Sequence, residues 1–217
     1  LKTLGVPNQN IILIDRTGVI YKGRTENINQ WKSAHAVETD ARTLEDALID
    51  ADVFIGLSIG NLLNASKIKC MKKQPIIFAM ANPEPEIMPD EVRKVFPDAI
   101  IATGRSDLPN QVNNVLGFPY IFRGALDVRA TAINEEMKKA AVYAIANLAR
   151  ENVPDEVSNA YGQDKITYGV DYIIPAPFDP RLIVEVSSAV AKAAIDSGVA
   201  TNPIKNCLLY TSDAADD

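Results

Sequence analysis

The sequence predicts an α/β protein with a doubly wound, mostly parallel sheet and a helical C-terminal part. Four short apolar runs alternate with helical stretches, and such runs are typical of parallel strands that are buried on both faces. The predicted strands are residues 10–15, 52–58, 75–81 and 99–104. From about residue 132 helical patterns replace this alternation, so the last third is predicted to be helical cover.

Local signals place the predicted helices. Thr43 with Asp46 three residues later can form a capping box, and Pro89 followed by two acids is typical of a helix N-terminus. Residues 133–151 have one apolar side, as in a long amphipathic helix, and the last predicted helix ends at Gly198. Because no internal repeat or low-complexity linker is present, we expect no second full domain.

Composition and charge exclude several classes of function. Of the 217 residues 47% are hydrophobic, and the net charge of -6 comes with no basic stripe, so we expect no nucleic-acid partner. No apolar run reaches the roughly 20 residues that span a bilayer and no signal pattern is present, so we expect no membrane partner and a cytoplasmic location. Cys70, Cys207 and the single His35 lack metal-site spacing, so any metal would need carboxylate ligands.

Asp15 is the first candidate for cofactor binding. It ends the apolar run of residues 10–15, and an acid at the carboxyl end of such a strand can accept both ribose hydroxyls of a dinucleotide. A turn-forming aspartate ahead of Gly18 explains the same residues equally well. The neighbouring Arg16 could pair with a 2′-phosphate, so the sequence leaves the choice between NAD and NADP open.

Asn82 is the second candidate, because the strand predicted at residues 75–81 delivers it to the carboxyl end. Its amide offers a donor and an acceptor without charge, which suits a carboxamide or a hydroxy acid. The alternative is a residue that only caps its own turn. We interpret the nearby Glu84 and Glu86 as a solvated pair rather than an acid–base couple.

Four side-chain amides crowd together after the strand predicted at residues 99–104. They are Asn110, Gln111, Asn113 and Asn114. Neutral amides beside apolar residues need partners, since an unpaired buried polar group costs about 1–3 kcal/mol. A polar ligand could supply these partners, and so could the backbone of the loop itself, so both interpretations stay open.

These motifs resemble the cofactor domain of bacterial malic enzymes. The blocks FAMANPEPEI (78–87) and ATGRSDLPNQVNNVLGFPYIFRGALD (102–127) carry the resemblance. It extends from LIDRTGVIYKGR (13–24) to PAPFDPRLI (175–183) and covers the chain from residue 1 to about 206. The resemblance implies a Rossmann-like fold, binding of NAD or NADP, and a parent enzyme that converts malate to pyruvate and CO2 with Mg or Mn.

The resemblance also implies roles for individual residues. Asn82 and Asn114 match positions that contact the nicotinamide end of the cofactor, Asn114 also contacts the substrate, and Asp15 matches the acid at the adenosine ribose. In the family the catalytic tyrosine and lysine and the acidic metal ligands precede the glycine-rich turn, and no residue here matches them. We therefore assign no catalytic residue and no metal ligand, and expect residues 1–206 alone to be inactive and the parent protein to be a homo-oligomer.

The sequence is expected to be incomplete at both ends. Residues 1–131 would be a Rossmann-like domain truncated at its N-terminus, and residues 132–206 the helical part of the same domain. Residues 207–217, CLLYTSDAADD, resemble the translation of a sequencing adapter. The alternatives are the cofactor domain of another two-domain dehydrogenase, which we expect to lack the paired ANP and QVNN blocks, and a non-catalytic binding or assembly module.

Overall fold

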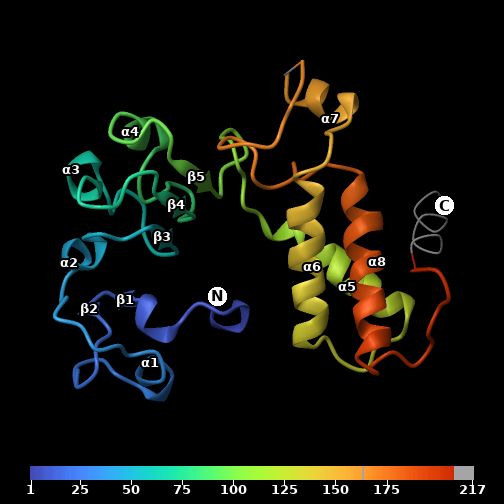
Figure 1. The fold of residues 1–217 in the computed structure, drawn as a ribbon, viewed down its shortest axis with the longest axis horizontal. Coiled ribbons are helices and arrows are strands. Elements are labelled where there is room, and N and C mark those ends of the chain that lie inside the picture. Colours follow the sequence, from blue (N-terminus) through green and yellow to red (C-terminus); the bar gives the residue numbers. More distant parts are fainter. Residues whose placement is uncertain (163, 208–217) are drawn as a thin grey trace.

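The computed structural model describes residues 1–162 and 164–207, in which an α/β part and a helical part lie beside each other (Figure 1). The strands are β1 Ile14–Asp15, β2 Gly18–Val19, β3 Val53–Gly56, β4 Ile76–Ala79 and β5 Ile100–Thr103. The α-helices are α1 Gln30–Ser33, α2 Leu44–Leu48, α3 Ala65–Ile68, α4 Pro89–Arg93, α5 Phe118–Asp127, α6 Glu135–Leu148, α7 Asp155–Ala160 and α8 Arg181–Asp196. Three 3-10 turns are η1 Lys2–Leu4, η2 Asn8–Asn10 and η3 Asn114–Leu116. The predicted adapter translation lies, from residue 208 onward, outside the described residues.

The sheet of β3, β4 and β5 confirms the predicted α/β class. Its strand order is β3-β4-β5, and both neighbouring pairs are parallel. The register aligns the last residues of the three strands, which are Gly56, Ala79 and Thr103. Because parallel strands in register end at one edge, the loops that leave them start from the same side of the sheet.

The two faces of this sheet are covered to different extents. Ile77 and Ile101 are buried on one face, where helices α2, α3 and α4 contribute Leu48, Ile68 and Val92 to the same core. On the other face, the β3 side chains Val53 and Ile55 are 46% and 41% exposed. Along the same face Phe78 of β4 is half-buried and Ala102 of β5 is buried, so within the described part of the chain the predicted burial of this face is met at β5 and not at β3.

The expected strand at residues 10–15 does not join the parallel sheet, so this part of the prediction is wrong. Ile14 and Asp15 form a short antiparallel ladder with Val19 and Gly18. The physical reason is a turn directly after Asp15: at Gly18 φ is 120°, and a Cβ there would lie 2.4 Å from the Arg42 carbonyl oxygen. Only glycine fits this turn, which sends the chain back on itself.

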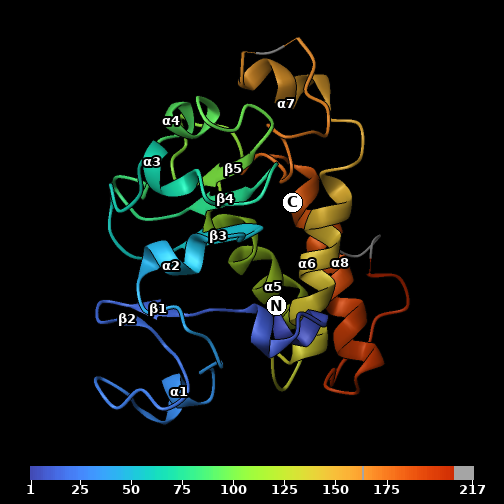
Figure 2. The same cartoon turned by 60° about the vertical axis from the view of Figure 1, so that its left-hand side comes forward.

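The helical part forms a second core. Figure 2 shows α6 and α8 running side by side with α5 packed against them, and buried side chains such as Met137 and Leu182 fill the space between these helices. The predicted long helix and last helix are thus confirmed as α6 and α8. Among the residues that the structure describes, every helix is too short or too polar to traverse a lipid bilayer.

The local helix signals are confirmed as well. Thr43 and Asp46 form the capping box of α2, and Pro89 is the first residue of α4. Gly198 follows α8 with φ of 74°, a left-handed conformation that suits glycine. Short-range sequence patterns therefore give the correct starts and ends of these helices.

We expect Gly124→Ala to destabilise the packing of α5 against α8. A Cβ at Gly124 would lie 2.4 Å from the Ser187 carbonyl oxygen and 3.0 Å from the Ala191 amide nitrogen, both backbone atoms. Overpacking of this kind costs about 1–3 kcal/mol, which outweighs the gain of about 1 kcal/mol in helix propensity. Thermal denaturation measures the effect, with Gly117→Ala as the control because its Cβ would meet nothing closer than 3.8 Å. Equal midpoints for the two variants would contradict this packing.

Candidate functional site

Asn82 lies at the carboxyl edge of the sheet, as the sequence predicts. It follows Ala79, the last residue of β4, by three positions and is exposed to solvent. Within residues 1–162 and 164–207 its side-chain amide makes no hydrogen bond to another group, so the interpretation as a turn cap has no support there. A free donor and a free acceptor therefore face solvent at this edge.

The loop after β5 brings Asn114 back toward the same edge. The Val112 amide donates a hydrogen bond of 2.8 Å to the Thr103 carbonyl oxygen, and Gln111 forms a parallel bridge with Thr103. Asn114 begins η3 two residues later, is exposed, and its side chain has no hydrogen-bond partner in the described part of the chain. Two unpaired amides thus follow the ends of neighbouring strands.

The amide cluster divides into structural and free members. Asn110 is 5% exposed, and its Nδ2 donates to the carbonyl oxygens of Ile101 and Val170, each at 2.8 Å. The Asn113 side chain accepts the Val115 amide and caps η3. The interpretation that such amides bond the chain itself therefore holds for Asn110 and Asn113, whereas Asn114 keeps its groups free for a ligand.

A half-buried arginine links the loops that leave β4 and β5. Arg105 donates from Nε to Asp107 Oδ1 at 2.9 Å, and its Nη1 lies 3.6 Å from Glu84 Oε1. The hydrogen bond from Arg105 lowers the pKa of Asp107. Because the two carboxylates are exposed, the ion pairs set the local shape of the edge more than its stability.

Glu86 corrects the interpretation of the two glutamates as a solvated pair. The side chain of Glu84 is 55% exposed, whereas Glu86 is 0% exposed. Its Oε1 accepts the Ser58 amide and its Oε2 accepts the Ala81 amide, each at 3.0 Å. The sequence carries no signal for this contact, because Ser58 lies 28 positions earlier and belongs to another loop.

Asp15 lies in the β1–β2 hairpin, which is separate from the sheet of β3, β4 and β5 (Figure 1). Its Oδ1 accepts Arg24 Nη2 at 2.8 Å, and its Oδ2 accepts Lys32 Nζ at 2.6 Å. Burial raises the pKa of Asp15, but the hydrogen bonds from Lys32, Arg24 and the Thr17 amide outweigh it and lower this pKa to about 2. Both oxygens are engaged within the chain, and the ribose role of Asp15 stays a prediction.

A family model described as malic enzyme, NAD binding domain, matches residues 6–161. The chain belongs to the malic enzyme family. The matched range contains β1 to β5, the loop exits at the carboxyl edge and the three predicted site residues Asp15, Asn82 and Asn114. The resemblance inferred from the ANP and QVNN blocks is therefore confirmed.

The malic enzymes that are similar to this chain include one named NADP-dependent and one named NAD-dependent. An NADP-dependent malic enzyme of Rhizobium meliloti strain 1021 is 62% identical over 97% of this chain, which spans 28% of that relative. An NAD-dependent malic enzyme of the same strain is 54% identical over 97% of this chain and 27% of the relative. The chain therefore spans little more than a quarter of the length of these curated relatives.

Solved malic enzyme structures confirm the Rossmann-like fold. The crystal structure of Entamoeba histolytica malic enzyme aligns with a TM-score of 0.81 and 33% identity, over 99% of this chain and 43% of the other. The NAD-dependent malic enzyme of Thermotoga maritima aligns with a TM-score of 0.72 and 37% identity, over 88% of this chain and 46% of the other. These matches extend through the helical part as well as the sheet.

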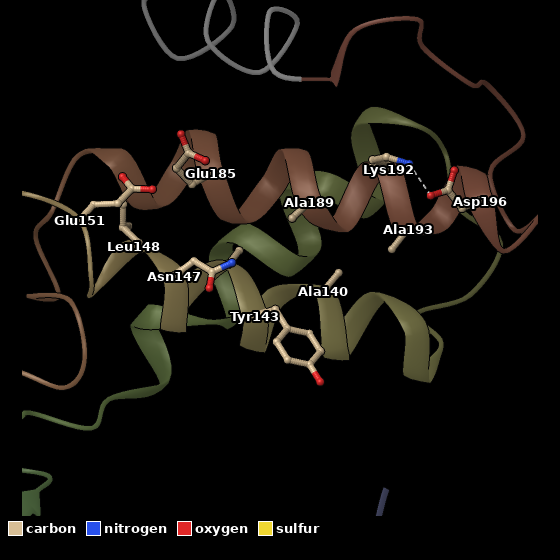
Figure 3. A pocket seen from close by; sticks show the side chains of 11 residues that line it. Ala140, Tyr143, Asn147, Leu148, Glu151, Glu185, Ala189, Lys192, Ala193 and Asp196 are labelled. Atoms are coloured by element: carbon tan, nitrogen blue, oxygen red, sulfur yellow. Dashed lines mark hydrogen bonds and ion pairs between the residues drawn. The ribbon is translucent and has the colours of Figure 1, made fainter. Parts of the chain in front are cut away.

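A shallow groove lies elsewhere on this malic enzyme chain, between α6 and α8 (Figure 3). It has a volume of about 440 Å³, and the small side chains Ala140, Ala189 and Ala193 form its floor. At one end Lys192 and Asp196 form an ion pair of 2.5 Å. None of the predicted site residues lines the groove, so it is separate from the carboxyl edge.

Proposed function

We propose that this chain is the cofactor domain of a malic enzyme that oxidises malate with NAD or NADP and releases pyruvate and CO2. The observation that carries the proposal is the 62% identity, over 97% of the chain, to an NADP-dependent malic enzyme. Because the chain spans 28% of that relative, the activity is proposed for the complete protein. Residues 1–131 would form the Rossmann-like portion and residues 132–206 its helical part, and a cytoplasmic location and homo-oligomeric assembly stay predictions from the sequence.

In this proposal the two free amides orient the reacting groups. Asn82 and Asn114 are exposed beyond the ends of β4 and β5 and have no hydrogen-bond partner in the described residues, which fits hydrogen bonding to a ligand. The nicotinamide, when bound, supplies the acceptor for the hydride that leaves C2 of malate. Asn82 would hold the carboxamide of the ring, and Asn114 would contact both the ring end and the substrate. Their contribution is orientation, because a neutral amide neither gives nor takes a proton at ordinary pH.

The described residues do not fit a divalent metal. Within residues 1–162 and 164–207, His, Cys, Asp and Glu side chains form no group of three or more that could hold a metal ion. Mg or Mn bound by protein needs several oxygen ligands that converge on one point. No step of the proposed chemistry therefore uses a metal held by these residues.

The charges around Asp15 favour NADP over NAD. Asp15 is already paired with Arg24 and Lys32, so its carboxylate is neutralised by two cations. Arg16 is exposed and forms no ion pair within the part of the chain that the structure describes. A free guanidinium beside a neutralised acid attracts a 2′-phosphate and gives no advantage to a free hydroxyl.

The test is the initial rate of malate-dependent cofactor reduction by the complete protein. We expect NADP to be reduced faster than NAD, and Arg16→Gln to raise the KM for NADP about tenfold while the KM for NAD changes little, since one charge-assisted hydrogen bond is lost. Lys22→Gln is the matched control, because Lys22 is a cation of the same segment that pairs with Glu38. Absence of malate-dependent reduction would overturn the proposed function. Equal KM changes for both cofactors would overturn only the NADP preference.

Residues 1–206 alone serve as a further arm of this test. We expect them to reduce no cofactor with malate, because the described residues hold no metal-binding cluster and the sequence matches neither the family's catalytic tyrosine nor its lysine. Malate turnover by residues 1–206 would show that they contain catalytic groups that we have not assigned.

A further inference from the structure

Glu86 joins the loops that leave β3 and β4. Its carboxyl group is fully buried, and no cation pairs with it among the described residues. The two oxygens instead accept one backbone amide each, from Ser58 after β3 and from Ala81 after β4, at 3.0 Å. A buried carboxyl group that bonds two separate loops restrains both of them.

The two amides occupy equivalent places just beyond the sheet. Gly56 and Ala79 are the last paired residues of β3 and β4, and Ser58 and Ala81 each follow them by two positions. Beyond the ladder such amides have no strand partner, so they need another acceptor. Glu86 supplies that acceptor to both amides, so its carboxyl group connects the two chain segments beyond the last backbone pairing of β3 with β4.

The surrounding backbone fits this carboxyl group closely. A Cβ at Gly56 would lie 2.3 Å from Glu86 Cδ, so β3 approaches the side chain as only glycine allows. The Leu63 amide donates to the Glu86 carbonyl oxygen at 2.9 Å, and the Asn61 amide donates to the Pro85 carbonyl oxygen at 2.9 Å. The loop after β3 is therefore held by the backbone of Pro85 and Glu86 as well as by the Glu86 carboxyl group.

We propose that Glu86 is the positioning residue for Asn82. The Ala81 amide that Glu86 holds directly precedes Asn82, so the carboxyl group sets the direction in which the Asn82 side chain leaves the sheet. This inference rests on the proposed function, because it gives Asn82 a ligand to hold. Glu86 itself is buried beneath the edge and touches no ligand.

The variant Glu86→Gln tests the proposal in the complete protein. Glutamine has nearly the same shape but only one acceptor oxygen, so its NH2 group faces one of the two amide donors and repels it. We expect kcat/KM for malate to fall about tenfold, as small displacements of orienting groups do. In an Asn82→Ala background the same substitution should cause no further loss, because the residue through which Glu86 acts is already gone.

The control is Glu91→Gln. Glu91 Oε1 also accepts a backbone amide, that of Ala65 at 2.7 Å, but this amide starts α3, whereas the amide that Glu86 holds directly precedes Asn82. We expect Glu91→Gln to leave kcat/KM unchanged even if it lowers the melting temperature. Circular dichroism of each variant shows whether it is folded.

If Glu86→Gln does not fold, Gly56→Ala takes its place, because the added methyl group displaces the carboxyl group from the opposite side. The proposal would be overturned if the substitution lowered kcat/KM equally in the wild-type and the Asn82→Ala backgrounds. It would also be overturned if Glu86→Gln left kcat/KM unchanged. Failure of both variants to fold would assign Glu86 to stability alone and overturn it too. If the wild-type protein does not oxidise malate, the proposed function fails instead, so the two failures are distinguishable.

Discussion

Replacement of Arg24 by alanine is expected to destabilise the N-terminal hairpin by about 3 kcal/mol, because the loss of a buried donor leaves its acceptors unsatisfied. Arg24 is 7% exposed and donates to the carbonyl oxygens of Glu26, Gly18 and Val19 as well as to both oxygens of Asp15. Its loss leaves these carbonyl groups without their donor and Asp15 with Lys32 as its remaining cation.

Amide hydrogen exchange measures this loss locally. The Val19 amide donates to the Arg42 carbonyl oxygen and the Ile20 amide to the Leu13 carbonyl oxygen, so both report on the hairpin. We expect their exchange to accelerate at least about 100-fold, the equivalent of about 2.8 kcal/mol. Lys22→Ala is the control: its ion pair with Glu38 is 61% and 82% exposed and contributes less than about 1 kcal/mol. Similar acceleration in both variants would contradict a special role for Arg24.

The same ion pair makes the hairpin sensitive to acid. The pKa of Asp15 is lowered from 3.8 to about 2 in the folded state. The contribution of the Asp15 ion pair to the stability of the hairpin is therefore complete above pH 3.8 and is lost as the pH falls through about 2. The difference between the wild type and Arg24→Ala should therefore shrink over this interval. A difference that stays constant across it would show that Arg24 stabilises the hairpin through its carbonyl contacts alone.

Asn114→Ala is expected to lower kcat/KM for malate by about 10- to 100-fold, which corresponds to the loss of one or two hydrogen bonds to bound groups. The reason is that the Asn114 amide is exposed and free in the described structure, so its bonding capacity serves a ligand in the proposed function. Steady-state kinetics of the complete protein with malate and NADP measure the effect.

The matched control for Asn114 is its neighbour. Asn113→Ser removes an amide at the adjacent position but keeps an oxygen that can accept the Val115 amide and cap η3. We expect kcat/KM to change less than about twofold in this variant, because serine keeps the capping hydrogen bond and the stability of the loop changes by only a few tenths of a kcal/mol. Equal losses for the two variants would mean that the loop, and not the Asn114 amide, matters for activity.

The sequence was sufficient to predict three of the four strands but not the fourth. Residues 52–58, 75–81 and 99–104 contain β3, β4 and β5, because short apolar runs that alternate with helical stretches are typical of the strands of a parallel sheet. Residues 10–15 show the same pattern yet form a hairpin. An apolar pattern indicates that a segment is buried, but it does not determine which strand the segment pairs with.

The same limit applies to the predicted site, because a local pattern does not identify the distant partner of a residue. Asn82 was placed correctly because strand ends can be read from the sequence, and the capacity of Asn114 for a ligand was one of two open interpretations. The structural roles of Asn110 and Glu86 could not be predicted, since their partners Val170 and Ser58 lie 60 and 28 positions away. Contacts of this kind depend on how the chain folds back, which no local motif encodes.

The exposed side of β3 has a practical consequence. In the described residues β3 pairs with β4 on one side only, so its other edge presents open backbone donors and acceptors beside the exposed Val53, Ile55 and Leu57. Such an edge is a template on which a strand from another molecule can add. We therefore expect this chain on its own to self-associate in concentrated solution, and we expect a charged side chain at Ile55 to reduce that self-association.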